Sequence, residues 1–344
     1  MVRLALLLAL AAVACQPIEV GRSSGAPSAS GSGVSGGAPG STSGAAPPAQ
    51  WRRISDIPTP RSEVAAAVYQ QDKVYVIGGF GSADRVERYD AATGRWDRLA
   101  DLPHGVDHAM SASVFGIQTS GDEGVYVFGG YAGAATARSF RFDVATGRWS
   151  EIAPMPSPRA AGAAVAINTR LYVVGGADGS RLISPTYVYD VTTRDWRTLA
   201  PIPTPRDHLA AVELNGRVCA VGGRRLSLST NLGTLECYLP QTDRWEKLAD
   251  APTPRGGVGA AAWDGRIYLI GGEQTSGTFK EVEIYDERTG SWSRGPDLPT
   301  PRHGIGVAAV GGTSEVPRGS ILVLSGGPTP GGSQTAVCEA LDVR

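Results

Sequence analysis

A unit of about fifty residues repeats along this chain and constrains its fold more than any other feature. A double glycine recurs at Gly78-Gly79, Gly129-Gly130, Gly175-Gly176, Gly222-Gly223, Gly271-Gly272 and Gly326-Gly327. After each of the first five pairs comes an aromatic residue, and a tryptophan follows it at a constant step, as in Tyr89 and Trp96. Such a long period is typical of repeat proteins, in which one supersecondary unit packs against the next.

Each unit contains short runs rich in β-branched and aromatic residues. In the first complete unit these runs are "SEVAAAVY", "VYVIGG", "VERYD" and "RWDRL". Gly, Asp, Asn or Pro residues bound the runs, and no helical period competes with the alternation. The sequence therefore predicts four antiparallel strands per unit, which we name a, b, c and d in chain order.

The turn between strands c and d is predicted to be tight, because the step from the aromatic residue to the tryptophan does not vary. Gly94, Gly147 and Gly290 lie in this turn and supply the positive φ that it requires. In contrast, the distance from the double glycine to the aromatic residue differs from unit to unit. Variation is therefore concentrated in the loop between strands b and c.

These motifs resemble kelch repeats, and the resemblance extends over residues 51–344. It implies an all-β fold, a six-bladed β-propeller. The last unit, "ILVLSGG" to "VCEALDVR", stops at strand c, whereas "WRRISDIPTP" at Trp51 is a d-strand with no strands before it. We therefore expect the N-terminal d-strand to complete the last blade and to close the ring without open sheet edges.

The first fifteen residues have the pattern of an export signal. Arg3 precedes an apolar run, the small residues Ala12 and Ala14 follow, and Cys15 comes next. This resembles a bacterial lipoprotein signal with Cys15 as the lipidated residue, although Ala12 stands where that family prefers Leu. Ordinary cleavage after Ala14 is the alternative.

Residues 16–50 consist mainly of Gly, Ser, Ala and Pro, a composition that predicts a disordered tether. We expect an exported protein that is anchored to a membrane by its lipid and faces the periplasm or the extracellular side. The net charge of −1 gives no general attraction to nucleic acid, and no apolar run is long enough to cross a bilayer. A monomer that contacts the membrane through the anchor alone is therefore expected.

One face of the propeller is predicted to carry recognition. Because adjacent strands alternate in direction, the d–a and b–c loops emerge together on what we call the loop face. Each "PTPR" or "PSPR" segment places an arginine there, at Arg61, Arg159, Arg206, Arg255 and Arg302. These arginines could bind an acidic ligand, or each could bond to loop carbonyls or an acidic neighbour in its own repeat. Their strict recurrence favours the structural role.

Departures from the repeat are more informative about a site. Two positions after the motif arginine, Glu63 and His208 stand where other units have small residues. Blade 2 lacks this arginine, but alignment of "DHAMSA" with "DHLAAV" places His108 at the same position, and His303 lies one position away. Arg224 and Arg225 concentrate positive charge at the b–c loop of blade 4. The candidate ligand-binding residues are therefore Glu63, His108, Arg206, His208, Arg224, Arg225, Arg255 and Arg302.

The polar cluster has two interpretations: acid–base or metal chemistry, or simply buried, hydrogen-bonded histidines. Because blades 2 and 4 are not adjacent, the sequence favours the second, and we expect no metal and no cofactor. Cys219 and Cys237 fall on neighbouring strands b and c, so they could form a disulfide or pack as free thiols.

Kelch motifs indicate the fold better than the function. The sequence shows no nucleophile elbow, phosphate-binding loop, zinc motif or set of His and Tyr ligands for a copper oxidase. We therefore expect a non-enzymatic binding module for a protein or a glycan, with no catalytic residue assigned. The alternative is a carbohydrate-active enzyme, since the exported kelch propellers that the chain resembles include a sialic-acid mutarotase.

Overall fold

The computed structural model describes residues 49–117, 122–314, 316 and 318–343. The expected signal peptide, Cys15 and nearly all of the expected tether lie outside these residues. Throughout the described ranges the secondary structure is strand, turn and loop, with no helix. Accordingly, no helix in that part of the chain is long and apolar enough to cross a membrane.

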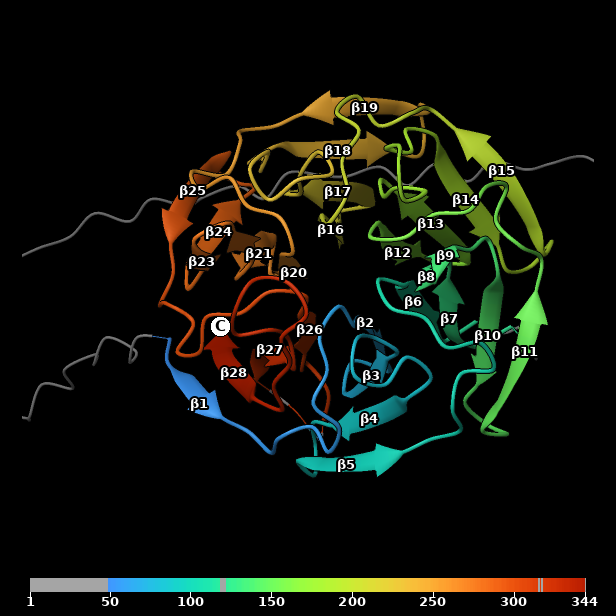
Figure 1. Cartoon of the computed structure of the whole chain (residues 1–344), viewed down its shortest axis with the longest axis horizontal. Helices are drawn as coiled ribbons and strands as arrows, with labels where there is room; N and C mark the ends of the chain where they lie inside the picture. The colour runs from blue at the N-terminus through green and yellow to red at the C-terminus, as the bar shows by residue number, and fades with distance from the viewer. Residues whose placement is uncertain (1–48, 118–121, 315, 317, 344) are drawn as a thin grey trace, which may run out of the picture. The chain divides into compact units, whose positions relative to one another are not determined.

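Six four-stranded antiparallel sheets form the blades of a propeller within the described residues (Figure 1). Blade 1 contains β2 (Ala65–Tyr69), β3 (Lys73–Ile77), β4 (Val86–Asp90) and β5 (Arg95–Arg98). Blade 2 contains β6 (Met110–Val114), β7 (Gly124–Phe128), β10 (Ser139–Asp143) and β11 (Arg148–Ile152). Blade 3 contains β12 (Ala163–Ile167), β13 (Arg170–Val174), β14 (Thr186–Asp190) and β15 (Asp195–Leu199).

The remaining blades follow the same order. Blade 4 contains β16 (Ala210–Leu214), β17 (Arg217–Val221), β18 (Leu235–Leu239) and β19 (Arg244–Lys247). Blade 5 contains β20 (Gly259–Trp263), β21 (Arg266–Ile270), β24 (Val282–Asp286) and β25 (Ser291–Arg294). Blade 6 contains β26 (Gly306–Val310), β27 (Gly319–Leu324), β28 (Cys338–Val343) and β1 (Trp51–Arg53). Short hairpins lie in two b–c loops: β8 (Tyr131–Ala132) with β9 (Ala134–Ala135), and β22 (Glu273–Gln274) with β23 (Gly277–Thr278).

The ring is closed as the sequence predicts. Strand β1, from the beginning of the propeller, pairs antiparallel with β28 from its end, and Trp51 lies opposite Leu341 (Figure 1). This pairing supplies the fourth strand of blade 6 and covers the edge that β28 would otherwise expose. The six-bladed all-β fold and its closure are therefore confirmed.

The recurrent tryptophans tie each blade to the one before it. On the d-strand of blade 1, Trp96 packs against Tyr89 with ring centroids 5.2 Å apart, and its Nε1 donates to the carbonyl of Ser55 at 2.9 Å. Trp149 makes the equivalent bond to Ala100. The aromatic residue and the tryptophan must lie opposite each other for this packing, so the turn between them has a constant length.

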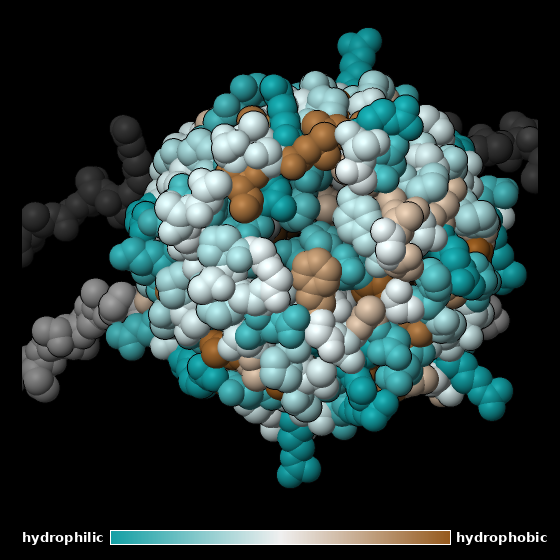
Figure 2. Space-filling view, in the orientation of Figure 1, coloured by the Kyte–Doolittle hydropathy of each residue, from teal (hydrophilic) through white to brown (hydrophobic). Residues whose placement is uncertain are grey.

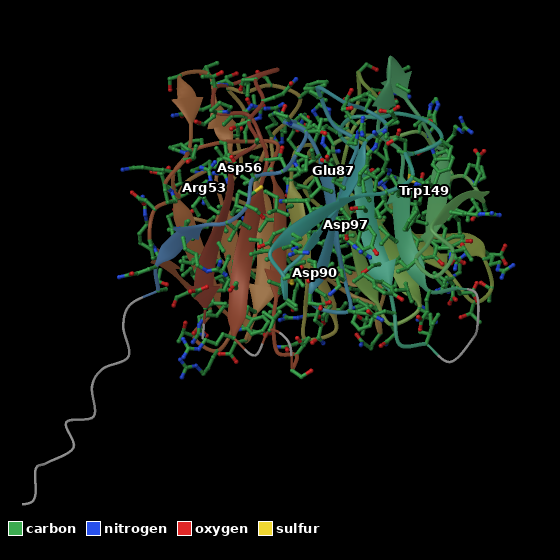
Figure 3. The ribbon with its side chains drawn as sticks, turned by 90° about the horizontal axis from the view of Figure 1, so that it is seen from below. Arg53, Asp56, Glu87, Asp90, Asp97 and Trp149 are labelled. Carbon is green, nitrogen blue, oxygen red and sulfur yellow. A yellow bond between two sulfur atoms is a disulfide. The ribbon has the colours of Figure 1, made fainter. Side chains whose placement is uncertain are left out.

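The c–d turns confirm the predicted glycine geometry. Gly94, Gly147 and Gly290 have φ values of 70°, 67° and 65°. Two blades use Arg194 and Asp243 at this turn, with φ values of 61° and 51°. Figure 3 shows Glu87 and Asp90, from the two ends of β4, lying toward opposite faces of the ring.

The sixth double glycine corrects one detail of the repeat. By hydrogen bonding and φ, Ser325 and Gly326, rather than Gly326 and Gly327, match the glycine pairs of the other blades. Serine is accepted because its hydroxyl bonds to the backbone of Arg61 in the neighbouring blade. In blade 4, Cys219 and Cys237 lie directly opposite each other with Cα atoms 4.0 Å apart and form a disulfide.

Candidate functional site

Six residues, one from each blade, surround the central axis at the loop face. All six have a positive φ, from 52° to 67°. In chain order they are Glu63, His108, Ala161, His208, Gly257 and Gly304, which we call the axial ring. The N–H of each of the last five members donates to the carbonyl of the member before it, at 2.7–3.0 Å. The N–H of Val64 donates to Gly304 at 3.4 Å and closes the circle.

This circle of hydrogen bonds holds side chains in a backbone conformation that residues other than glycine rarely adopt. It also explains why some members are small. A Cβ on Gly304 would lie 2.6 Å from the carboxyl group of Glu63, so the two neighbouring positions cannot both carry a large side chain. Glu63 and His108 therefore lie between Gly304 and Ala161 in the ring, and His208 lies between Ala161 and Gly257.

His108 and His208 come together across the axis, although their blades are not adjacent. Their ring centroids are 4.9 Å apart, with the rings in an edge-to-face arrangement. The expectation that distance between blades 2 and 4 would keep these residues apart is therefore wrong. The axial ring is narrow enough for alternate members to touch, which a count of blades along the sequence does not reveal.

Each of these histidines is oriented by the aspartate that precedes it. Nδ1 of His108 lies 2.6 Å from Oδ1 of Asp107, and Nδ1 of His208 lies 2.7 Å from Oδ2 of Asp207. The second nitrogen of His108, Nε2, lies 3.3 Å from Oε2 of Glu63. In both imidazoles Nδ1 thus lies next to an aspartate carboxylate. Nε2 is the nitrogen that can contact a group near the central axis.

The environment shifts the protonation of these groups in different directions. Burial alone would raise the pKa of Glu63, but three neighbouring imidazoles hold that pKa well below its ordinary value. Burial opposes the charging of His108, yet Glu63 and Asp107 raise its pKa above the ordinary value. For His208, burial outweighs Asp207 and lowers the pKa. The pKa values of the two touching histidines are therefore shifted in opposite directions.

His303 and Glu273 complete the cluster from blades 6 and 5. His303 is fully buried, with Nδ1 3.0 Å from Oε1 of Glu63 and 3.5 Å from Oε2 of Glu273. Its Nε2 lies 3.1 Å from the carbonyl of Thr329. Burial works against its charge, but these two carboxylates raise the pKa of His303.

Glu273 was missed by the sequence reasoning. It is the residue directly after a double glycine, and this position differs in every blade: Phe80, Tyr131, Ala177, Arg224 and Glu273 occupy it in the first five. That variability inside a regular repeat is the signal that could have identified it.

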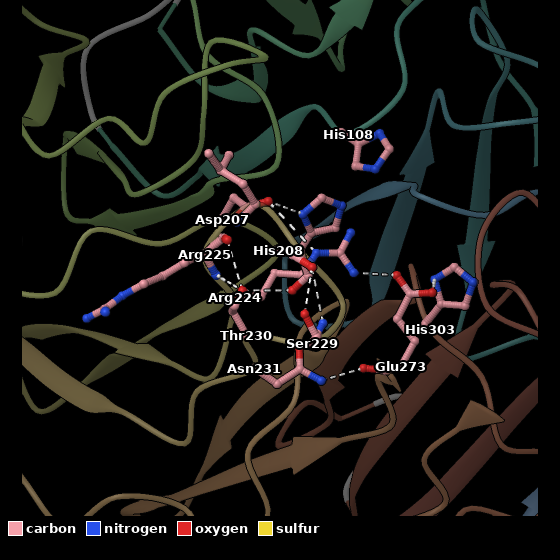
Figure 4. A network of polar contacts seen from close by, with 12 residues as sticks. His108, Asp207, His208, Arg224, Arg225, Ser229, Thr230, Asn231, Glu273 and His303 are labelled. Carbon is pink, nitrogen blue, oxygen red and sulfur yellow. Dashed lines mark hydrogen bonds and ion pairs between the residues drawn. The ribbon is translucent and has the colours of Figure 1, made fainter. Parts of the chain in front are cut away.

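Arg224 and Arg225, the two arginines predicted to concentrate positive charge in blade 4, have different environments. Nη1 of Arg224 lies 2.7 Å from Oε1 of Glu273, and its Nε lies 3.9 Å from Asp207 (Figure 4). Its charge is therefore largely balanced within the cluster. Arg225 is exposed, and its side chain extends away from the network.

The three motif arginines among the candidate ligand residues are out of a ligand's reach. Arg206, Arg255 and Arg302 are fully buried. Arg206 donates to Glu236 and to backbone carbonyls such as that of Gly222 at 2.8 Å. The structure therefore favours the structural alternative for these arginines, because their N–H groups are used inside their own blades.

A cavity of about 490 Å³ opens above the axial ring at the loop face. Glu63, His108 and His208 line its floor, and Phe80 and Tyr131 contribute to its walls. The two aromatic rings meet His108 edge to face, with centroids 5.2 and 5.5 Å away. Figure 2 shows apolar groups near the centre of the molecule within mainly hydrophilic surroundings. The cavity, which we call the mouth cavity, thus combines apolar walls with a charged floor.

The floor also has the donor atoms of a cation site. One ligand atom from each of Glu63, His108 and His208 lies within 4.8 Å of the others, and the same holds for Glu63, Glu273 and His303. The fold thus brings together in space residues that are far apart in the sequence.

Comparison with known proteins agrees with the fold. The kelch motif model matches residues 65–103, 119–156, 158–203, 205–252 and 254–299, which together make up more than half of the chain. Beta-scruin of Limulus polyphemus is 28% identical over 155 residues, which are 40% of this chain and 16% of that protein.

Two further relatives are similar over comparable lengths. The kelch-like protein terF of Aspergillus terreus is 29% identical over 150 residues, 38% of this chain and 31% of that protein. A kelch repeat-containing protein of Arabidopsis thaliana is 32% identical over 144 residues, 40% of this chain and 32% of that protein. The similarity thus spans less than a third of each of these three relatives.

Proposed function

This chain belongs to the kelch-repeat proteins, a family that commonly binds other proteins, and we propose that it binds a protein or glycan ligand at the mouth cavity of its loop face. The observation that carries the proposal is the composition of this cavity. It joins the aromatic side chains of Phe80 and Tyr131 to a floor of paired charges.

Such a cavity has the features of a recognition site. Aromatic residues and arginine supply much of the binding energy at protein interfaces, especially where polar surroundings exclude water from the contact. Arg224 is only partly exposed, and on the same loop Leu226 is 48% exposed although it is apolar. A ligand that enters the cavity would contact Tyr131 and Arg224, and one that also covers this loop would bury Leu226.

The experiment uses defined probes rather than an unknown ligand. A displayed peptide library and a glycan array are screened with the protein, and affinity is then measured for the strongest probe. Tyr131→Ala and Leu226→Ser should each weaken binding at least about tenfold. The matched control is Lys247→Ala, on the outer strand β19, which should leave affinity unchanged.

Melting temperatures separate binding from folding. Tyr131→Ala and Leu226→Ser should both melt close to the wild type, because Leu226 is exposed and Tyr131 is only partly buried. Unchanged affinity in both, with the control also unchanged, would show that the ligand binds elsewhere.

A sugar-converting activity is a second candidate, because His108 and His208 touch at the floor of the cavity, with ring centroids 4.9 Å apart. The pKa of His108 is raised and that of the adjoining His208 is lowered, which is the separation that an acid–base pair needs. Any sugar that binds on the array is therefore followed by NMR for exchange between its anomers. Binding without faster exchange would leave the binding function alone.

We also propose that the chain is anchored through its N-terminal segment. Export with lipidation at Cys15 would hold the propeller at a membrane, with residues 16–50 as the spacer. The support is the sequence pattern of the first fifteen residues, and simple secretion after cleavage is the alternative.

A further inference from the structure

We propose that Glu63, His108 and His208 bind one divalent transition-metal ion, of the kind represented by Zn²⁺, at the floor of the mouth cavity. This goes beyond ligand binding by the propeller, which needs no metal. The donor set is two imidazoles and one carboxylate. These ligands suit Zn²⁺ and other first-row divalent ions better than Mg²⁺ or Ca²⁺, which prefer oxygen atoms alone.

The geometry places the donors within range of a shared ion. One ligand atom of each residue lies within 4.8 Å of the other two. Bonds of about 2.0–2.2 Å bring the ligands of a tetrahedral zinc site to roughly 3–3.5 Å from one another. A small inward rotation of the side chains is enough, because the axial ring already holds the three backbones in place.

The carboxylates around the two histidines favour a metal site over simple buried histidines. Asp107 and Asp207 each accept from Nδ1 of the histidine that follows them, at 2.6 and 2.7 Å. A carboxylate on the far nitrogen is the usual partner of a metal-binding histidine, since it fixes the ring and directs the other nitrogen to the ion. Here two histidines that touch each other have this same arrangement.

The third ligand is held in a comparable way. Oε1 of Glu63 contacts Nδ1 of His303 at 3.0 Å, which leaves Oε2 on the side of His108. Oε2 of Glu63 and Nε2 of His108 lie 3.3 Å apart. A metal ion would take the place of the proton between them.

The neighbouring combination of Glu63, Glu273 and His303 is a poorer site. Both nitrogens of His303 already have acceptors, the carboxylate of Glu63 and the carbonyl of Thr329. Glu273 is also occupied, by Arg224 at 2.7 Å and by the N–H of Gly331 at 3.0 Å. We therefore assign His303 and Glu273 as supporting groups near Glu63 and not as metal ligands.

Three protein ligands leave a coordination position open. The floor residues line the mouth cavity and also a smaller cavity lined by Val64, Leu209 and Ile305. An open position on the side of the mouth cavity can be reached by a water molecule or by an acidic group of a bound ligand. An ion held there is accessible to small molecules, in contrast to one in a closed structural site.

The test measures metal binding without any other ligand. The full-length chain is freed of metal by chelation and titrated with ZnCl₂ by calorimetry and with CoCl₂ by visible absorption. One ion should bind per chain, and the Co²⁺ spectrum should show the strong d–d bands of a four- or five-coordinate ion. MgCl₂ should give no heat of specific binding.

Variants identify the ligands and their supports. His208→Gln and Glu63→Gln should abolish stoichiometric binding, and Asp207→Asn should weaken it about 10- to 100-fold. His104→Gln is the matched control, because His104 lies outside the cluster. Zn²⁺ should raise the melting temperature of the wild type and the control but not that of His208→Gln.

Two results would overturn the site: no saturable Zn²⁺ binding by the wild type, or binding that survives in both His208→Gln and Glu63→Gln. If a ligand variant fails to fold, Asp207→Asn decides, because it keeps every ligand and changes the carboxylate that orients His208. Unchanged affinity in a folded Asp207→Asn would also count against the proposal.

Discussion

Arg206 and Glu236 form an ion pair that is almost completely withdrawn from solvent, with 2.7 Å between Nη1 and Oε2. The same pair recurs in blades 1, 5 and 6 as Arg61 with Glu87, Arg255 with Glu283 and Arg302 with Glu339. Blade 2 lacks both charges, since Val106 and Phe140 occupy the two positions. The chain thus contains its own apolar replacement for the pair.

This relationship predicts how blade 4 responds to mutation. Glu236→Ala should lower the free energy of unfolding by about 3–5 kcal/mol, because it leaves a buried guanidinium without its counter-charge. The double variant Arg206→Val, Glu236→Phe, which copies blade 2, should recover most of that loss. Urea denaturation measures both. A double variant as unstable as Glu236→Ala would show that the charges themselves are required.

Closure of the ring gives a second prediction. Deletion of residues 51–57 removes β1 together with Ile54 and Ile57, which are buried against Val74 and Leu322. The free energy of unfolding should fall by more than about 4 kcal/mol, and the exposed edge of β28 should promote aggregation. Deletion of residues 16–49 is the control. Melting temperature and gel filtration compare the two, and equal melting would contradict closure by β1.

The disulfide gives a third prediction. Cys219 and Cys237 enclose a loop with a sequence separation of 18, for which cross-linking contributes about 2–4 kcal/mol. Alkylation of the unfolded, unreduced protein should modify Cys338, a buried free thiol, but neither Cys219 nor Cys237. Reduction should expose both and lower the denaturation midpoint. Equal alkylation of all three before reduction would exclude the bond.

Membrane attachment is tested by Cys15. If this residue carries the lipid, Cys15→Ser should move the protein from the membrane fraction to the soluble fraction. A salt wash of the membranes serves as the control for loose association. Retention of Cys15→Ser at the wild-type level would contradict lipid anchoring, and a soluble wild-type protein that begins at Cys15 would favour ordinary secretion.

Much of the fold could be predicted because its signals are local. The turn around Gly94 needs a positive φ, and the step from Tyr89 to Trp96 spans one tight hairpin. These features are visible within a few residues, and they recur in successive units. The incomplete last unit and the isolated strand at Trp51 then left one way to close the ring.

The site could be predicted only in part. Glu63, His108 and His208 could be identified because each breaks the repeat. Glu273 and the contacts of His303 could not be identified in this way. The buried motif arginines were included as ligand contacts although their recurrence pointed to a structural role. A repeat pattern identifies equivalent positions, but it does not tell whether a charge faces a ligand or a carboxylate in its own blade.

The sequence by itself determined the architecture: four strands per unit, six blades, the closing strand and the face that carries the variable loops. Only the tertiary structure decided which side chains meet at the axis. Glu63 and His303 are 240 residues apart and in contact, and His108 touches His208 across the ring. Strand formation depends on neighbours in the chain, whereas convergence at the axis depends on the radius of the closed ring, which no single repeat encodes.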